Sequence, residues 1–151
     1  DYVATVIKTY REAIDSYYEG TFTKEKINTW MEALATVYNR GFWSGYYLGQ
    51  KLGEWSDNPG SNATQKKVYV GKGMHYFPKS NIAEFKIEAY DIKKGDKILI
   101  TGPSTGAQEL ILEDFFVNDA TSEKATKGDS CTLKVPFRIR LSDKMYKIVE
   151  N

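Results

Sequence analysis

Lys94-Gly95-Asp96-Lys97-Ile98-Leu99-Ile100 and Lys127-Gly128-Asp129-Ser130-Cys131-Thr132-Leu133 are two stretches of the same design. In each, a charged turn containing glycine and aspartate leads into a run of alternating or β-branched apolar residues, which is typical of a strand. From residue 66 to 151, about six such strands alternate with turn signals roughly every ten residues. The pattern predicts a small antiparallel β-barrel, a fold that serves more often to hold substrates than to carry out chemistry.

The expected strands follow the period of two that places alternate side chains on opposite faces of a sheet. They cover residues 68–70, 83–89, 98–101, 109–117, 130–135, 139–141 and 146–149. Turns are expected at 78–81, at Gly102-Pro103 and at Asn118-Asp119, where turn-forming residues interrupt the alternation.

The first third of the chain has a helical period instead. Apolar residues recur at helical spacing over residues 2–18 and again over 27–38. Gly20 has the position of a helix end, Thr23 that of an N-cap, and Gly41 that of a glycine after a helix. We therefore expect an antiparallel helical hairpin within residues 1–52. A polar, turn-rich linker over 53–65 would join it to the barrel, which makes the fold class α+β.

Composition and charge limit the possible partners. The net charge is +1 overall, and it divides into zero for residues 1–52, −2 for 53–65 and +3 for 66–151, which is weak support for a polyanionic partner of the barrel. No apolar stretch approaches the length of a membrane helix, and a single cysteine excludes an internal disulfide. We expect a cytoplasmic protein. Because the chain begins at Asp1 inside a helical pattern, we interpret it as part of a longer protein.

Several segments resemble one protein family. They are Tyr2-Val3-Ala4-Thr5-Val6-Ile7 with Tyr10-Arg11, Asn39-Arg40-Gly41-Phe42 with Gly45-Tyr46, Tyr69-Val70-Gly71, and 92–98 with Gly102-Pro103. Together they cover nearly the whole chain and resemble the C-terminal part of the U32 peptidases, the collagenase-like proteases. The barrel is in turn similar to the second domain of translation elongation factors.

This resemblance implies an accessory domain of an enzyme. The family's catalytic signature, a segment with glycine and cysteine in a TIM-like barrel, lies upstream and is absent here, so no residue of this chain receives a catalytic role. Some members are associated with hydroxylation of transfer or ribosomal RNA and others with collagen degradation. The resemblance therefore implies an upstream catalytic domain as partner and leaves open whether the parent is a protease or an RNA-hydroxylation enzyme.

The residues themselves offer little chemistry. A metal site needs several His, Cys or carboxylate ligands, and the chain has only His75 and Cys131 of the first two types. Cys131 alternates with polar neighbours on a strand and has no adjacent base, so a buried apolar role is favoured over a nucleophile. Glu113 and Asp114 are adjacent, so on a strand they would face opposite sides and could not act as an acid–base pair. We expect neither a metal nor a cofactor.

Two sets of residues are candidate contact sites. The first is a basic stripe for RNA or another substrate, formed by Lys134, Arg138 and Arg140 at even offsets with Lys66, Lys67 and Lys72 as neighbours. The alternative is an ordinary solvated strand face, and Pro136 interrupts the stripe. The second is the segment with Asn39, Arg40, Phe42, Trp43 and Tyr46, which would contact the catalytic domain if exposed or form the hairpin's own core if buried.

We therefore predict a non-catalytic C-terminal accessory domain that binds or positions an RNA or polypeptide substrate for the catalytic domain. The alternative is a structural module that packs on that domain or mediates oligomerisation.

Overall fold

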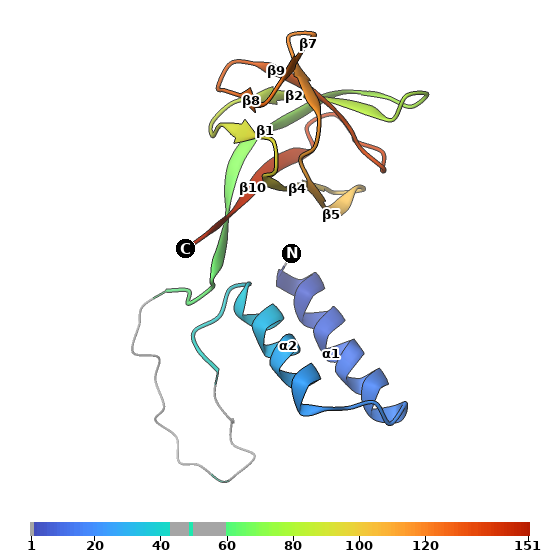
Figure 1. Ribbon diagram of the computed structural model, residues 1–151, viewed down its shortest axis with the longest axis vertical. Helices are drawn as coiled ribbons and strands as arrows, with labels where there is room; N and C mark the ends of the chain where they lie inside the picture. Colours follow the sequence, from blue (N-terminus) through green and yellow to red (C-terminus); the bar gives the residue numbers. More distant parts are fainter. Residues whose placement is uncertain (1, 43–48, 50–59) are drawn as a thin grey trace. The chain divides into compact units, whose positions relative to one another are not determined.

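The computed structural model describes residues 2–42, 49 and 60–151 of the chain (Figure 1). These residues form two compact units, one made of Asp1–Lys66 with Glu150–Asn151 and the other of Lys67–Val149. The first unit holds two helices and the second a large antiparallel sheet, which confirms the α+β class. Much of the expected linker, residues 53–59, lies outside the described residues.

Helix α1 (Tyr2–Tyr18) ends as its sequence predicts. Gly20 adopts a left-handed conformation with φ of 69°, which a side chain would disfavour. The backbone N–H of Thr21 then donates to the carbonyl of Ser16 over 2.9 Å, and the N–H of Gly20 donates to that of Tyr17 over 3.2 Å. These two bonds form a Schellman motif, which satisfies carbonyls that the end of a helix leaves unpaired.

Helix α2 (Lys24–Ala35) begins at the predicted N-cap but ends earlier than predicted. The hydroxyl of Thr23 accepts a hydrogen bond from the N–H of Lys26 over 3.3 Å. At the other end the carbonyl of Ala35 accepts from the N–H of Thr64 over 3.0 Å, so a later segment replaces the next helical turn. Gly41 is left-handed, with φ of 94°, but it lies well beyond the helix rather than directly after it.

The described residues beyond the helices form ten strands, and eight of them make one antiparallel sheet. In chain order the strands are β1 (Gln65–Phe77), β2 (Ile82–Ile87), β3 (Ile92–Lys93), β4 (Lys97–Gly102), β5 (Gly106–Ile111), β6 (Phe115–Val117), β7 (Ala120–Ser122), β8 (Lys124–Ala125), β9 (Ser130–Lys134) and β10 (Lys144–Glu150). The order in the large sheet is β5-β4-β10-β1-β2-β9-β6-β7, and β3 pairs with β8 separately. Among the described residues, no pairing joins β5 to β7, so the predicted barrel is not closed by hydrogen bonds.

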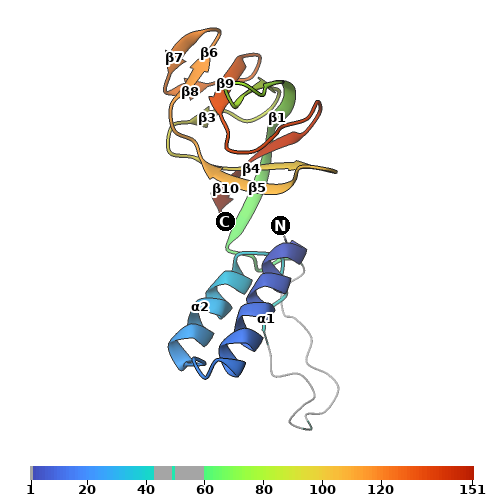
Figure 2. The same ribbon diagram turned by 90° about the vertical axis from the view of Figure 1, so that its right-hand side faces the viewer.

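The sheet nevertheless curls around one apolar core (Figure 2). Side chains from β1, β2, β4, β6, β9 and β10 meet in a single cluster, which a flat sheet could not achieve. The largest of its fully buried members include Phe85, Phe115, Ile98, Ile100 and Met145. Burial alternates strictly along β2, where Ala83, Phe85 and Ile87 point inward, as the sequence pattern predicts.

Two strand predictions are wrong. The stretch 109–117 is not one strand, because β5 ends at Ile111 and β6 begins at Phe115. Between them Leu112 bonds to the first Gly-Asp turn, donating to the carbonyl of Asp96 over 2.9 Å and accepting from Gly95 over 2.8 Å. Residues 139–141 are also not a strand; they enter a tight turn instead.

That turn matches the two Gly-Asp turns of the sequence. In each, an aspartate accepts a hydrogen bond from the backbone N–H three residues earlier: Asp96 from Lys93 over 2.8 Å, Asp129 from Thr126 over 2.7 Å, and Asp143 from Arg140 over 2.9 Å. The third residue of each turn has positive φ, at Gly95, Gly128 and Ser142. Each aspartate is followed directly by a strand, β4, β9 or β10. Three corners of the β unit therefore share one design.

Candidate functional site

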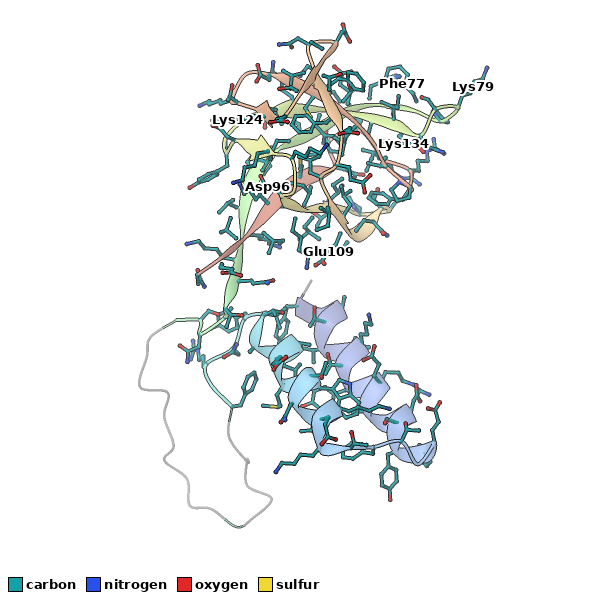
Figure 3. All side chains as sticks on the ribbon, viewed as in Figure 1. Phe77, Lys79, Asp96, Glu109, Lys124 and Lys134 are labelled. Carbon is teal, nitrogen blue, oxygen red and sulfur yellow. The ribbon has the colours of Figure 1, made fainter. Side chains whose placement is uncertain are left out.

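A groove lies over the outer face of β2 and β9, beside the hairpins that join β1 to β2 and β6 to β7. We call it the hairpin groove. It measures about 600 Å³ and is lined by Phe77, Ser80, Ile82, Glu84, Asn118, Asp119, Ser130 and Thr132. The hydroxyl of Ser130 donates to the carboxylate of Glu84 over 2.6 Å, and the ring of His75 packs on Phe77 with centroids 4.4 Å apart. Figure 3 shows Phe77 and Lys79 on the hairpin that follows β1.

A second groove lies where β5 ends and the chain leaves β9. We call it the seam groove. It measures about 880 Å³ and is lined by Asn81, Leu110, Ile111, Leu112, Glu113, Asp114, Leu133, Lys134, Val135 and Pro136. Apolar side chains form its floor, and Ile111 remains 56% exposed. The carboxylates of Glu113 and Asp114 lie at its rim with Lys134.

The predicted basic residues do not form one patch. Lys67 lies near the start of β1, over the ring of Tyr146 at 5.2 Å from its centroid. Lys134 is paired with Ile82, whose partner on β1 is Phe77 at the far end of that strand. At about 3.3 Å per residue, the path along β1 from Lys67 to Phe77 is on the order of 30 Å. Lys66 and Lys67 therefore lie far along the strand from the position opposite Lys134.

The remaining basic candidates have separate surroundings. Lys72 lies on β1 and forms an ion pair with Glu88 over 2.9 Å, so part of its charge is already neutralised. Arg138 and Arg140 are exposed. Because β9 ends at Lys134, no continuous strand carries Lys134 together with these two arginines. Val135, next to Lys134, and Ile139, between the two arginines, are buried. Exposed and buried residues therefore alternate here although no strand forms.

Glu88 also organises an aromatic cluster on the outer face of β1. The hydroxyl of Tyr69 donates to its carboxylate over 2.6 Å, and Tyr69 packs edge-on against Tyr146 with centroids 5.7 Å apart. Burial and this bond raise the pKa of Tyr69 to about 12. The hydrogen bonds from Tyr69 and Lys72 lower the pKa of Glu88. The cluster is internally satisfied, so it is a structural feature of this face.

The predicted interdomain segment is only partly described. Trp43 and Tyr46 lie outside the described residues. The side chain of Asn39 closes a local turn, donating to the carbonyl of Val37 over 2.9 Å and accepting from Gly41 over 3.1 Å. The guanidinium of Arg40 donates to the hydroxyl of Tyr38 over 3.1 Å, and Phe42 is 49% exposed. Asn39 thus has a structural role, while Phe42 is available for contact.

The helical unit carries an apolar surface, and its exposure was not predicted from the sequence. An amphipathic helix in a globular protein normally buries its apolar stripe. On α1 the stripe faces outward, and we call it the α1 face; it consists of Val3, Ile7, Tyr10, Ile14 and Tyr17, which are between 49% and 70% exposed. The buried residues of α1 are instead the small and polar Thr9 and Ser16.

The contact with α2 explains this orientation. The ammonium group of Lys26 donates to the hydroxyls of Ser16 and Thr21 over 3.1 and 2.8 Å. These two hydroxyls also lie 2.9 Å apart and bond to each other. The polar network therefore closes the hairpin at its turn, while the α1 face stays largely exposed. The last member of that face, Tyr17, packs edge-on against Phe22 with ring centroids 6.5 Å apart.

Cys131 is fully buried in the core, and burial raises the pKa of its thiol to about 12, so it is held neutral. The described residues contain no group of three or more His, Cys, Asp or Glu side chains placed to hold a metal. None of the described helices is long and apolar enough to cross a membrane.

Sequence reasoning missed the two grooves and the α1 face. Glu84 and Asp119 come together only because β2 and β9 pair and the 115–122 hairpin folds beside them. Ile111 appears in sequence as one more apolar strand residue. Its exposure depends on the position of β5 at the end of the sheet, which an alternating pattern does not specify.

By its fold this is an α+β protein with a curled, antiparallel β unit. Comparison with known proteins makes the class specific. The sequence profile described as Peptidase family U32 matches residues 1–57, which include both helices. The chain is 50% identical over 147 residues to a protein named collagenase from Porphyromonas gingivalis (strain ATCC BAA-308 / W83), an alignment that covers 97% of this chain and 36% of the relative.

Two further comparisons are consistent with the same family. The chain is 32% identical over 153 residues to a protein named as an uncharacterized protease from Methanocaldococcus jannaschii, with 99% of this chain and 37% of the relative covered. A crystal structure of the C-terminal domain of a Geobacillus thermoleovorans protein assigned to the U32 peptidases covers 52% of this chain and 90% of its own, with 20% identity and a TM-score of 0.50. The prediction that the chain resembles the C-terminal region of peptidase family U32 is confirmed. The chain spans little more than a third of the length of these curated relatives.

Proposed function

We propose that this chain is an accessory domain of a U32 peptidase and that its β unit holds a polypeptide substrate. The observation that carries the proposal is the character of the two grooves. Each combines an exposed apolar side chain with a carboxylate in its lining: Phe77 with Glu84 in the hairpin groove, and Ile111 with Glu113 in the seam groove.

A nucleic acid fits these grooves poorly. A protein that tracks a phosphate backbone lines its groove with Lys and Arg, because neutralising phosphates supplies most of the affinity. Lys134 is the basic residue in the described lining of the seam groove, and that lining also includes Glu113 and Asp114. Carboxylates at the edge of a groove repel phosphate and attract basic side chains, so the charge favours a polypeptide.

The relatives are consistent with this substrate class. The Porphyromonas gingivalis proteins are named collagenases, which designates enzymes that act on a polypeptide. A separate domain that holds an extended chain would help such an enzyme because it raises the local concentration of substrate at a catalytic domain on the same polypeptide.

Binding of gelatin and of transfer RNA to the purified chain distinguishes the two substrate classes. We expect retention on immobilised gelatin that persists as salt is raised, and no mobility shift with transfer RNA even at low salt. An RNA complex that weakens steeply with salt would instead identify a polyanion-binding domain. Absence of binding to gelatin would contradict the proposal.

The α1 face supports a second role, packing on the rest of a longer polypeptide. Five large apolar side chains on one helix face are a contiguous surface of the kind that marks an interface. The match of the peptidase family profile to residues 1–57 supports the rest of the peptidase domain as the partner, because that profile includes α1. The two roles are compatible, since they use different units of the chain.

A further inference from the structure

We propose that an extended polypeptide segment binds in the seam groove by adding as a strand to the free edge of β5. This inference rests on the proposed polypeptide-holding function and names the site that performs it. The occupant is an extended segment with apolar side chains at alternate positions and a basic side chain near the acidic rim.

The backbone of β5 supplies the first reason. β5 is the terminal strand of the eight-stranded sheet, and its strand pairing within the described residues is to β4 alone. A terminal strand presents a row of N–H and C=O groups that an added strand can pair with. The six residues of β5, Gly106–Ile111, offer an edge of about 20 Å.

This edge lacks the usual protection. Natural sheets block their edges with short strands, prolines, bulges or inward charges. β5 contains neither proline nor lysine, and its one charged residue, Glu109, is held by Lys97 on β4 over 2.7 Å. At the opposite end of the sheet β7 is only three residues long, which protects that edge.

The groove beside the edge supplies the second reason. β6 pairs with β9 only as far as Leu133, so the chain from Lys134 to Pro136 is not covered by β6. The lining of the seam groove includes Leu110 and Ile111 from the end of β5 and Val135 and Pro136 from the chain after β9. A segment added to β5 would place alternate side chains over this apolar floor.

The rim sets the charge of the occupant. Asp114 is paired with Lys94 over 2.5 Å, whereas Glu113 forms no ion pair within the described part of the chain. A basic side chain on the added segment would complement Glu113. An acidic side chain at the same position would meet the carboxylate of Glu113, so the site discriminates by charge there as well as by backbone.

The probe is a fluorescein-labelled octapeptide of alternating valine and lysine, titrated into the 151-residue chain and followed by fluorescence anisotropy. Two matched probes accompany it, one with its lysines replaced by glutamate and one N-methylated at alternate residues. The N-methylated peptide keeps the side chains but cannot pair along one edge. We expect it and the acidic peptide to bind at least about tenfold more weakly, the loss that about 1.4 kcal/mol produces.

Two variants test the location. Ile111→Thr keeps a β-branched residue and removes apolar contact with the groove, so we expect about fivefold weaker binding. Ala120→Thr introduces the same residue on β7, the other edge, and should leave binding unchanged. Thermal unfolding of both variants verifies that they fold as the parent does.

The outcomes separate this inference from the proposed function. If gelatin is retained but the N-methylated peptide binds as well as the parent peptide, or Ile111→Thr binds normally, the chain holds polypeptides elsewhere and strand addition at β5 is wrong. If neither gelatin nor any octapeptide binds, the polypeptide-holding function itself fails.

Discussion

The carboxylate of Asp143 occupies the space beside Gly102 in which any other residue would place its Cβ. Asp143 is 2% exposed, and its Oδ2 accepts hydrogen bonds from the hydroxyl of Thr105 over 2.5 Å and from the backbone N–H of Arg140 over 2.9 Å. A residue at the end of β4 and a turn before β10 are thus fitted to each other. Gly102 is required here by close approach, since its φ is not in the left-handed region.

Replacing Gly102 with alanine should therefore destabilise the β unit. The new methyl group would displace the buried carboxylate of Asp143, and overpacking of this kind costs about 2 kcal/mol. Urea unfolding of the parent and of Gly102→Ala gives the difference. In an Asp143→Ala background the same substitution should cost much less, because the space is then free. Additive effects of the two changes would show that the close approach is not the cause.

Replacing Ser142 with glycine should stabilise the β unit. It adopts φ of 68° at the turn position that Gly95 and Gly128 occupy in the two equivalent turns. A left-handed conformation costs a non-glycine residue about 1 kcal/mol, partly offset by the greater freedom of glycine in the unfolded chain. We expect Ser142→Gly to raise the free energy of unfolding by a few tenths of a kcal/mol to about 1 kcal/mol. Leu141→Gly, one residue earlier and without positive φ, is the control and should destabilise.

The turn that contains Ser142 and Asp143 was not predicted from the sequence. Gly95-Asp96 and Gly128-Asp129 are visible as a pair because both use glycine, the residue that favours positive φ. Ser142-Asp143 makes the same turn with the same aspartate bond, but its serine does not signal positive φ, and the sequence there predicts a strand over 139–141. Both helices and most strands follow from periodicity, because apolar residues recur at the spacing that is typical of each element.

The assembly of those elements was less predictable. β5 and β6 are separate strands, and Leu112 between them bonds to Gly95 and Asp96, a contact between parts of the chain that are distant in sequence. The stripe on α1 was visible in sequence, but its partner was not. Periodicity shows that a helix has an apolar face, whereas the network of Lys26, Ser16 and Thr21 decides which side α2 covers.

The stability of the β unit should fall in alkali in part through Tyr69. Burial and the bond to Glu88 raise its pKa from 10.0 to about 12. Below the lower value Tyr69 is protonated in both states, so its contribution is fully present. As the pH rises from about 10 to about 12, the unfolded chain releases this proton while the folded chain retains it, so unfolding becomes easier.

Urea unfolding across this pH range measures the effect. Tyr69→Phe removes the titrating group, so its stability should decline less steeply with pH than that of the parent. Tyr90→Phe is the control at a tyrosine that is 59% exposed, and its profile should follow the parent. Equal slopes for the parent and Tyr69→Phe would show that the raised pKa does not contribute to folding stability.

Polar substitutions on the α1 face should affect association more than folding. Ile7 and Ile14 are 64% and 49% exposed, so Ile7→Ser with Ile14→Ser should change the unfolding free energy of the 151-residue chain by no more than about 0.5 kcal/mol each. In a longer polypeptide that contains this chain, the same pair would remove apolar area from an interface, and we expect a loss of about 1 kcal/mol or more per side chain. Lys8→Ser, on the same helix but outside the stripe, is the matched control.

Hydrogen exchange on α1 gives a second measure, since packing on the rest of the peptidase should protect the helix beyond its protection in the isolated chain. Equal protection in both contexts would mean that the rest of the peptidase domain does not cover the α1 face, and self-association of the isolated chain, abolished by the isoleucine pair, would then assign this face to a second copy.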